Sequence, residues 1–181
     1  MIVKFWKTYL KRATILRNSI TMAAHHTDLP LLEKLTMSLT SDRKRAAATC
    51  IVFKNSILLG KRIEKWRGMP VPYGGYWSVF GGVVEEGESP FQAASRELME
   101  ETQIKIHPSE LSFVKLIKEG NLDFILYAYE ASDLLLPTLD EEHTEYGWFK
   151  ISELDHFPEK IDPKIVDGIK FYIKTREGKC I

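Results

Sequence analysis

The chain has 181 residues, which is enough for one domain with a substantial core and too few for two comfortable ones. Lysine plus arginine number 25, as do aspartate plus glutamate, so no net charge favours DNA or an acidic partner. No apolar run reaches the length of a membrane span, and Cys50 and Cys180 have no metal-site or redox spacing. We therefore expect a cytoplasmic protein that binds no DNA.

The first 21 residues form a separate pattern, in which apolar side chains recur at helical spacing and lysines lie opposite them. The apolar positions are Ile2, Phe5, Trp6, Tyr9, Ala13, Leu16 and Ile20. This predicts a basic amphipathic helix. It could pack on the domain or on the second subunit of a homodimer, lie on a membrane surface, or act as an organelle-targeting transit peptide. Met22 leaves open a second start of translation.

A second short helix is expected over Leu31–Leu39, because Pro30 stands near its start and leucines form its apolar stripe. We therefore divide the chain into an N-terminal helical extension, residues 1–44, and a main domain, residues 45–181.

The main domain is expected to interleave strands with helices. Apolar or alternating runs predict strands at Ala46–Phe53, Ile57–Lys61, Trp77–Phe80, Leu111–Lys118 and Leu122–Glu130, with another ending at Trp148-Phe149. The segment Glu64–Tyr76, rich in proline and glycine, predicts one long loop. A last helix is expected to open at Asp162-Pro163. Helices between strands of a mixed sheet indicate an α/β fold with both faces of the sheet covered.

The start of a central helix is strongly specified. Ser89 is a good N-cap, Pro90 suits the first helical position, and Gln92 completes a capping box. We therefore predict a helix over Pro90–Thr102.

Three acids on this helix carry the strongest chemical signal in the chain. Glu97, Glu100 and Glu101 are spaced i, i+3 and i+4, which places their carboxylates on one face, within reach of a common point. A run of acids on a helix is usually a solvated face. Like charges this close repel unless a cation lies among them, however, and Mg²⁺ binds through a few carboxylates with water and substrate phosphate. The spacing predicts a metal site.

The surrounding residues favour the metal site over the solvated face, because they extend the cluster into a longer pattern. The pattern consists of Gly82, Glu88, Arg96, Glu97, Leu98, Glu100, Glu101 and Ile104. It resembles the Nudix box, whose hydrolases split a pyrophosphate that links a nucleoside to another moiety. The glycine usual before the final aliphatic residue is Gln103 here. Gln103 would take a left-handed conformation at a cost on the order of 1 kcal/mol, but it removes no ligand.

The resemblance implies an α/β/α sandwich with a mixed sheet, and it implies the metal ligands. Glu97, Glu100 and Glu101 are expected to bind Mg²⁺, or Mn²⁺ as a substitute, together with the backbone carbonyl of Gly81. Glu88 is either an outer ligand or a brace for its loop.

Arg96 is expected to point away from Glu97, because neighbouring residues on a helix differ by roughly 100°. We therefore predict a structural ion pair between Arg96 and a loop carboxylate such as Glu88, rather than a phosphate contact.

The general base is expected from a late segment of the chain, unless Glu97 of the box supplies it. The run Asp140–Trp148 resembles a segment of dinucleoside tetraphosphate hydrolases and some nucleotide pyrophosphohydrolases. The resemblance makes Glu142 the leading candidate for the base or for an additional metal ligand, and Glu145 the second. The alternative is that these acids only form an acidic surface loop. The resemblance leaves His143 either a phosphate contact or an ordinary exposed histidine.

The substrate is the least determined feature. Arg62, Arg67 and Tyr76 flank or occupy the loop before the motif, and a mixture of cations and aromatic rings suits phosphate neutralisation and base stacking. Aromatic residues near such a loop are as often packing anchors.

The favoured function is that of a metal-dependent pyrophosphohydrolase acting on a nucleoside diphosphate derivative or a dinucleoside polyphosphate. The alternatives are sanitation of noncanonical nucleoside triphosphates, removal of an RNA cap, and a catalytically silent Nudix domain that senses a nucleotide. A silent domain is expected to have lost acids of the box, and this chain has kept them.

Overall fold

The computed structural model describes residues 43–176. The expected amphipathic helix, the short helix over Leu31–Leu39 and nearly all of the predicted extension over residues 1–44 therefore lie outside the described residues. The helices are α3 (Pro90–Thr102) and α4 (Pro163–Arg176), with short 3₁₀ turns η1 (Pro108–Glu110) and η2 (Ile151–His156). The strands are β1 (Lys44–Phe53), β2 (Ser56–Arg62), β3 (Lys65–Trp66), β4 (Met69–Pro70), β5 (Trp77–Ser78), β6 (Phe80–Val83), β7 (Ser112–Glu119), β8 (Leu122–Glu130) and β9 (His143–Lys150).

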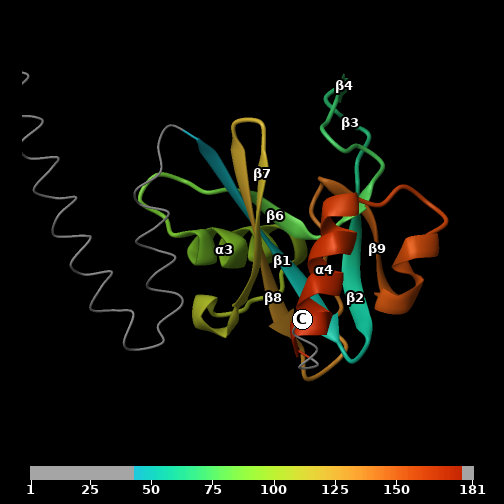
Figure 1. Ribbon diagram of the computed structural model, residues 1–181. Helices are drawn as coiled ribbons and strands as arrows, with labels where there is room; N and C mark the ends of the chain where they lie inside the picture. The colour runs from blue at the N-terminus through green and yellow to red at the C-terminus, as the bar shows by residue number, and fades with distance from the viewer. Residues whose placement is uncertain (1–42, 177–181) are drawn as a thin grey trace, which may run out of the picture. The chain divides into compact units, whose positions relative to one another are not determined.

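Seven of these strands form one mixed sheet in the order β5-β2-β1-β8-β7, with β6 also paired to β1 and β9 to β2 (Figure 1). The strands β1 and β8 run parallel, from the pair Lys44–Leu122 to the pair Val52–Glu130. The other pairings of this sheet are antiparallel. The central strand β1 therefore has neighbours along its whole length, which explains its nearly continuous apolar sequence.

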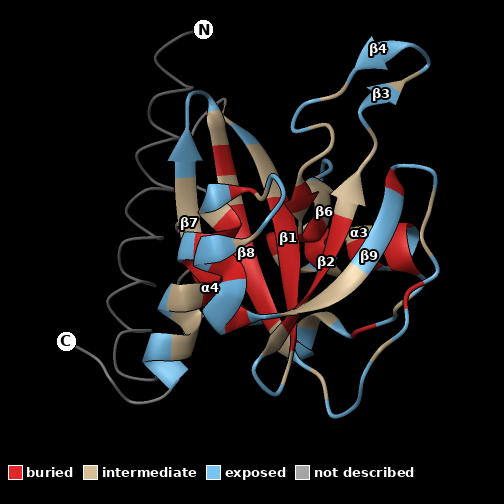
Figure 2. Ribbon diagram, turned by 90° about the vertical axis from the view of Figure 1, so that its right-hand side faces the viewer, coloured by how far each residue is buried: buried red, intermediate tan, exposed pale blue. Residues whose placement is uncertain are grey.

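Helices cover the two faces of the sheet. On one face Ala48, Cys50 and Val52 belong to a buried cluster that includes Ile165 and Ile169 of α4. On the other face α3 packs against β1 and β6, and the buried hydroxyl of Thr49 donates to the carbonyl of Ala94 at 3.3 Å. Figure 2 shows the buried residues concentrated in β1, β2 and β8 between these layers. The predicted α/β/α sandwich with a mixed sheet is confirmed.

The segment over Glu64–Tyr76 is not one open loop, as the sequence had predicted. It contains the small hairpin β3–β4, which turns at Arg67 and Gly68 with positive φ angles of 49° and 83°. Two successive residues with positive φ are typical of the tightest hairpin turns. Glycine at the second position suits this turn.

The strand predicted over Trp77–Phe80 is divided in two. β5 pairs with β2, whereas β6 pairs with β1. The change of partner places Gly81 and Gly82 inside a strand rather than after one. None of the helices within residues 43–176 is long and apolar enough to cross a membrane.

The helix α3 has the predicted bounds. The Ser89 side chain accepts from the backbone N–H of Gln92, and the Gln92 side chain accepts from the backbone N–H of Ser89 at 2.9 Å, which completes the capping box. Gln103 ends the helix with φ 61° and ψ 11°, in the left-handed region that a glycine would adopt freely. Both ends of the acid-bearing helix are thus held by local interactions.

Candidate active site

Two glycines of β6 allow close contacts with different neighbours. A Cβ atom on Gly81 would collide with Ala47 and Ala48 of β1, so glycine lets the two strands pair closely. A Cβ atom on Gly82 would stand 2.5 Å from the Cδ of Glu97, which is shorter than any real Cβ contact. Only glycine therefore lets the Glu97 carboxylate approach the strand backbone.

Glu101 is the most buried acid of the motif, with 5% of its surface exposed. Its carboxylate accepts a hydrogen bond from the backbone N–H of Gly81 at 2.8 Å. Burial raises the pKa of Glu101 to about 8, although the Gly81 hydrogen bond acts in the opposite direction. Burial also raises the pKa of Glu97, against the effect of its bond to Arg96. Both carboxylates are thus held where a positive charge would stabilise their ionised form.

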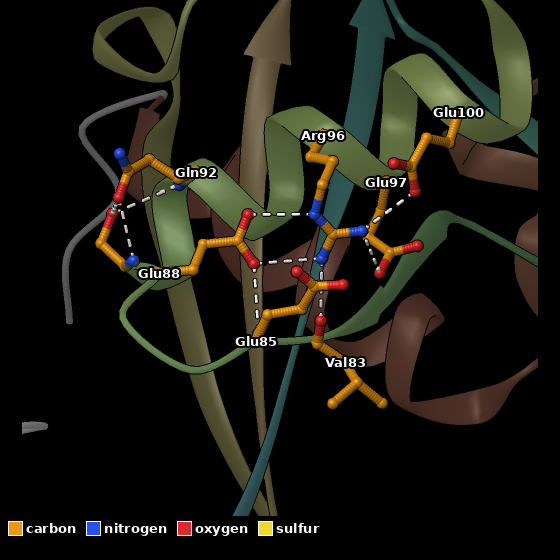
Figure 3. Close-up of polar contacts among 8 residues, drawn as sticks. Val83, Glu85, Glu88, Gln92, Arg96, Glu97 and Glu100 are labelled. Atoms are coloured by element: carbon orange, nitrogen blue, oxygen red, sulfur yellow. Dashed lines mark hydrogen bonds and ion pairs between the residues drawn. The ribbon is translucent and has the colours of Figure 1, made fainter.

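Arg96 supplies part of that charge within the protein (Figure 3). Its guanidinium group donates to both carboxylate oxygens of Glu88 at 3.0 Å, to Glu97 at 2.8 Å and to Glu100 at 2.9 Å. It also donates to the backbone carbonyl of Val83 at 3.0 Å.

The predicted pair of Arg96 with Glu88 is confirmed, but Arg96 does not point away from Glu97. Its guanidinium group lies between Glu88 on one side and Glu97 and Glu100 on the other (Figure 3). Glu88 also accepts from the backbone N–H of Glu85 at 3.2 Å, as a brace for the loop would.

The predicted ligands therefore divide into two groups. Glu97, Glu101, Gly81 and Gly82 line a common cavity, whereas Glu88 and Glu100 do not. Within residues 43–176, no three histidine, cysteine or acidic side chains converge closely enough to form a metal cluster. Glu97 and Glu101 nevertheless fit a hard divalent ion, because they are closely placed oxygen donors whose charge is incompletely compensated.

The cavity has a volume of about 520 Å³, within the usual range for a small-molecule site. Its polar wall comprises Arg62, Tyr73, Ser78, Glu97, Glu101, Glu119, Glu142, Asp162 and Lys164. Its remaining lining residues are Ala46, Ala48, Pro72, Val79, Gly81, Gly82, Val83, Leu122 and Phe124. Glu97 and Glu101 of α3 thus border a concave space lined by both apolar and charged groups.

Glu142 lies in this cavity, just before β9. Its carboxylate accepts from Nη2 of Arg62 at 3.2 Å, and about half of its side chain is exposed. Its backbone N–H donates to Asp140 at 3.0 Å, and the Asp140 N–H donates to the carbonyl of Glu101 at 3.1 Å. Asp140 thus ties the loop that bears Glu142 to the end of α3.

Glu145 is placed elsewhere. It lies within β9 rather than in the loop before it, and its carboxylate pairs with Lys61 at 3.2 Å. It lines a neighbouring cavity that Arg62 shares. The structure therefore brings Glu142, but not Glu145, beside Glu97 and Glu101.

His143 is not an exposed histidine. Its ring lies 5.1 Å from that of Phe80, and its Nδ1 lies 3.1 Å from a carboxylate oxygen of Asp140. Burial lowers the pKa of His143, while the Asp140 contact opposes this shift. His143 does not line the cavity, because on β9 its side chain points inward toward Gly60.

Two of the predicted substrate contacts also lie outside the cavity lining. Arg67 is at the tip of the β3–β4 hairpin beside the Trp66 ring, and Tyr76 packs edge-on against Tyr73. Of the two predicted cations, Arg62 and Arg67, Arg62 lines the cavity.

Several residues of the site were not found from the sequence. Glu119 of β7 and Asp162 and Lys164 at the start of α4 line the cavity with Tyr73. Lys164 donates to Glu119 at 2.7 Å and to the Tyr73 hydroxyl at 2.5 Å. These residues come from separate elements and share no motif, so no local signal indicated them.

The family model of the NUDIX domain matches residues 43–168. The chain belongs to the Nudix family.

Similarity to curated proteins is partial. The chain is 32% identical over 87 residues to an RNA pyrophosphohydrolase of Bartonella quintana (strain Toulouse), which is 47% of this chain and 46% of that protein. It is 37% identical over 70 residues to an octanoyltransferase of Myxococcus xanthus, which is 39% of this chain and 16% of that protein. The chain thus matches less than half the length of these curated relatives.

Solved Nudix structures resemble the fold over most of their length. A MutT/Nudix protein of Listeria innocua matches with a TM-score of 0.59 and 23% identity, over 77% of this chain and 97% of that chain. A MutT protein of Methanosarcina mazei Go1 matches with a TM-score of 0.58 and 23% identity, over 78% of this chain and all of that chain. These likenesses concern the fold of this Nudix domain.

Proposed function

We propose that this Nudix domain is a divalent-metal-dependent pyrophosphohydrolase that cleaves the diphosphate linkage of a nucleoside diphosphate derivative or a dinucleoside polyphosphate. The observation that carries the proposal is the pair of desolvated carboxylates, Glu97 and Glu101, on the wall of a cavity of about 520 Å³. Such a pair is poorly stabilised alone and well suited to a bound cation.

Glu97 and Glu101 would hold the ion, Mg²⁺ or Mn²⁺, with the Gly81 carbonyl, and Glu100 could join once its bond to Arg96 is released. A bound divalent ion would neutralise phosphate charge and acidify a water molecule. Glu88 is tied to Arg96 and to the Glu85 backbone, so we assign it a bracing role in the loop.

Other side chains of the same cavity would bind the phosphates and accept the proton of the attacking water. Arg62 carries a fixed positive charge toward the phosphates, and its bond to Glu142 orients that carboxylate. Glu142, half exposed, can accept a proton from the attacking water. The water oxygen then forms a bond to phosphorus, the bridging P–O bond breaks, and the leaving phosphate keeps the electron pair.

The other side of the cavity suits a nucleoside. Phe124, Leu122 and Ala46 offer apolar surface, and the Tyr73 phenol lies beside the Lys164 ammonium, which stands 4.2 Å from the ring centroid. An apolar surface with a few placed polar groups is the usual composition of a small-molecule site.

A second candidate is the removal of a pyrophosphate group from RNA. The relative named RNA pyrophosphohydrolase favours it, at 32% identity over 47% of this chain. The balanced charge of the chain opposes a long RNA footprint, because RNA binding draws much of its affinity from phosphate contacts.

Product analysis distinguishes these candidates. Purified protein is assayed with ADP-ribose, diadenosine tetraphosphate, several nucleoside triphosphates and a 5′-triphosphorylated RNA, with Mg²⁺ and with a chelator. We expect hydrolysis of a diphosphate derivative or dinucleoside polyphosphate with Mg²⁺ and none with the chelator. Hydrolysis of the RNA alone would favour the second candidate, and no hydrolysis of any compound would contradict both.

A further inference from the structure

A second cavity lies beside the candidate active site and shares Arg62 with it. Its volume, about 520 Å³, equals that of the first. Arg62 donates to Glu142 in the first cavity, and its Nε is buried without a hydrogen-bond partner among the described residues. Arg62 thus borders both cavities.

The charge of the second cavity is balanced. Its charged lining residues are the basic Lys61, Arg62 and Lys160 and the acidic Glu64, Glu145 and Glu159. Three positive and three negative groups give no excess charge to attract a phosphate chain. Carboxylates accept from hydroxyl groups and ammonium groups donate to them, so this lining suits a neutral group rich in hydroxyls.

The polar groups are held in place before any ligand binds. The Lys61 ammonium lies 2.7 Å from Glu159 and 3.2 Å from Glu145, and it stands 5.7 Å from the centroid of the Trp77 ring. Both carboxylates remain about half exposed, so they keep free acceptor positions toward the cavity. Groups fixed in advance lose little entropy when they bind a ligand.

Thr144 adds a hydroxyl to this wall. It lies between His143 and Glu145, where the register of the β2–β9 pairing shifts. An extra residue in a strand redirects its side chain, and such bulges often occur beside active sites. Thr144 is exposed and lines the second cavity.

We propose that the second cavity binds the hydroxyl-bearing moiety on the far side of the diphosphate, a ribose or another sugar, while the nucleoside occupies the first cavity. This inference rests on the proposed function and makes the substrate two-ended. The diphosphate would then pass Arg62, which borders both spaces. A compound that lacks the second moiety would leave the second cavity unused.

The test compares ADP-ribose with ADP, which lacks the terminal ribose. Dissociation constants of both ligands are measured by calorimetry on the full chain, in buffer that contains a chelator. The wild type is compared with Thr144→Phe, whose side chain fills the second cavity. Aromatic residues are well tolerated in strands. We expect the ratio of the ADP-ribose to the ADP dissociation constant to rise about tenfold, which is typical of losing a small set of polar contacts.

The control is Ser112→Phe, a similar substitution at an exposed position of β7 that lines neither cavity. It should leave the ratio unchanged. If Thr144→Phe fails to fold, Glu159→Gln serves instead, because it weakens the pair with Lys61 on an exposed segment.

Two further results test the proposed role of the second cavity. An unchanged ratio in the cavity variant, with ADP-ribose bound by the wild type, would overturn the inference while leaving the hydrolase proposal intact. The same measurement with diadenosine tetraphosphate distinguishes a second nucleoside from a simple sugar, since the ligand that loses more affinity has the moiety that the cavity accepts. Failure of the hydrolase proposal would instead appear as absent turnover in the wild type with Mg²⁺, whether or not the ratio of dissociation constants rises in Thr144→Phe.

Discussion

Among the acids of α3, Glu101 differs from those that Arg96 neutralises. The guanidinium group of Arg96 binds Glu88, Glu97 and Glu100. Glu101 has a backbone N–H as its hydrogen-bond donor, lies almost fully buried, and has a pKa of about 8. The charge of Arg62 favours its ionised form but does not offset the effect of burial, so Glu101 is the acid whose charge a bound cation would change most.

The stability of the metal-free protein should reflect this pKa. The ordinary pKa of a glutamate is 4.5, so between that pH and about 8 the folded state binds more protons at Glu101 than the unfolded state. Stability contributed by this group is thus fully present below the ordinary pKa and lost as the pH rises through the folded value. Glu101→Gln should remove this loss. Urea unfolding in buffer with a chelator should show the variant more stable than wild type at pH 9 but not at pH 4. If the free energy of unfolding varies with pH in the same way in both proteins, the raised pKa of Glu101 is contradicted.

Glu142 should matter for chemistry more than for binding. Glu142→Gln keeps the size of the side chain but cannot accept a proton, so kcat should fall roughly 100-fold while KM changes little. Glu145→Gln is the matched control for kcat, because Glu145 lies in the neighbouring cavity, where its loss should change KM rather than kcat. Steady-state kinetics would decide between them. A larger loss in the control would move the base to Glu145, and near-normal kinetics in both would return it to Glu97.

At the level of elements, the sequence predicted best what depends on local interactions. The bounds of α3 follow from Ser89, Pro90 and Gln92, which act within one turn. The split between β5 and β6 could not be predicted, because it depends on which distant strand each one pairs with. The residues of the site divide in the same way, into those that one segment carries and those that distant elements bring together.

The acids of the motif share one helix and were found together. Asp140 and Lys164 act only after β9 and α4 are packed, and no periodicity near them indicates a site. The burial of His143 was missed for a similar reason, because it depends on Phe80 from another strand.

The C-terminus of α3 offers a test of backbone strain. Gln103 has a positive φ, which costs a side-chain-bearing residue roughly 1 kcal/mol, and glycine would adopt it without that cost. Gln103→Gly should therefore raise the free energy of unfolding by about 0.5 kcal/mol, since greater freedom of the unfolded chain offsets part of the gain. Urea unfolding measures this change, with Gln92→Gly, inside the helix, as a destabilising control. A clear loss of stability in Gln103→Gly would show that the Gln103 side chain contributes more than its strain costs.

For the whole molecule, the predicted amphipathic helix over residues 1–21 should be dispensable for catalysis. Among residues 43–176, those that line the two cavities lie between Ala46 and Lys164. A protein that starts at Met22 should fold and keep its turnover, while it loses dimerisation, membrane association or import, whichever the helix provides. Light scattering, vesicle binding and kinetics on both lengths test this prediction. A folded but inactive shorter chain would place the segment in the active site or in an obligatory dimer.

The central claim is that carboxylates of α3 bind a metal ion that hydrolysis requires, and the turnover of Glu101→Gln tests it most directly. The amide keeps the size of the side chain and can still accept from the Gly81 N–H, so the variant should fold as wild type. A neutral amide is a poor ligand for Mg²⁺ and leaves phosphate charge uncompensated. We predict that kcat/KM, measured with Mg²⁺ on the best substrate of the panel, falls by roughly three orders of magnitude or more. A folded Glu101→Gln protein with near wild-type hydrolysis would contradict the account.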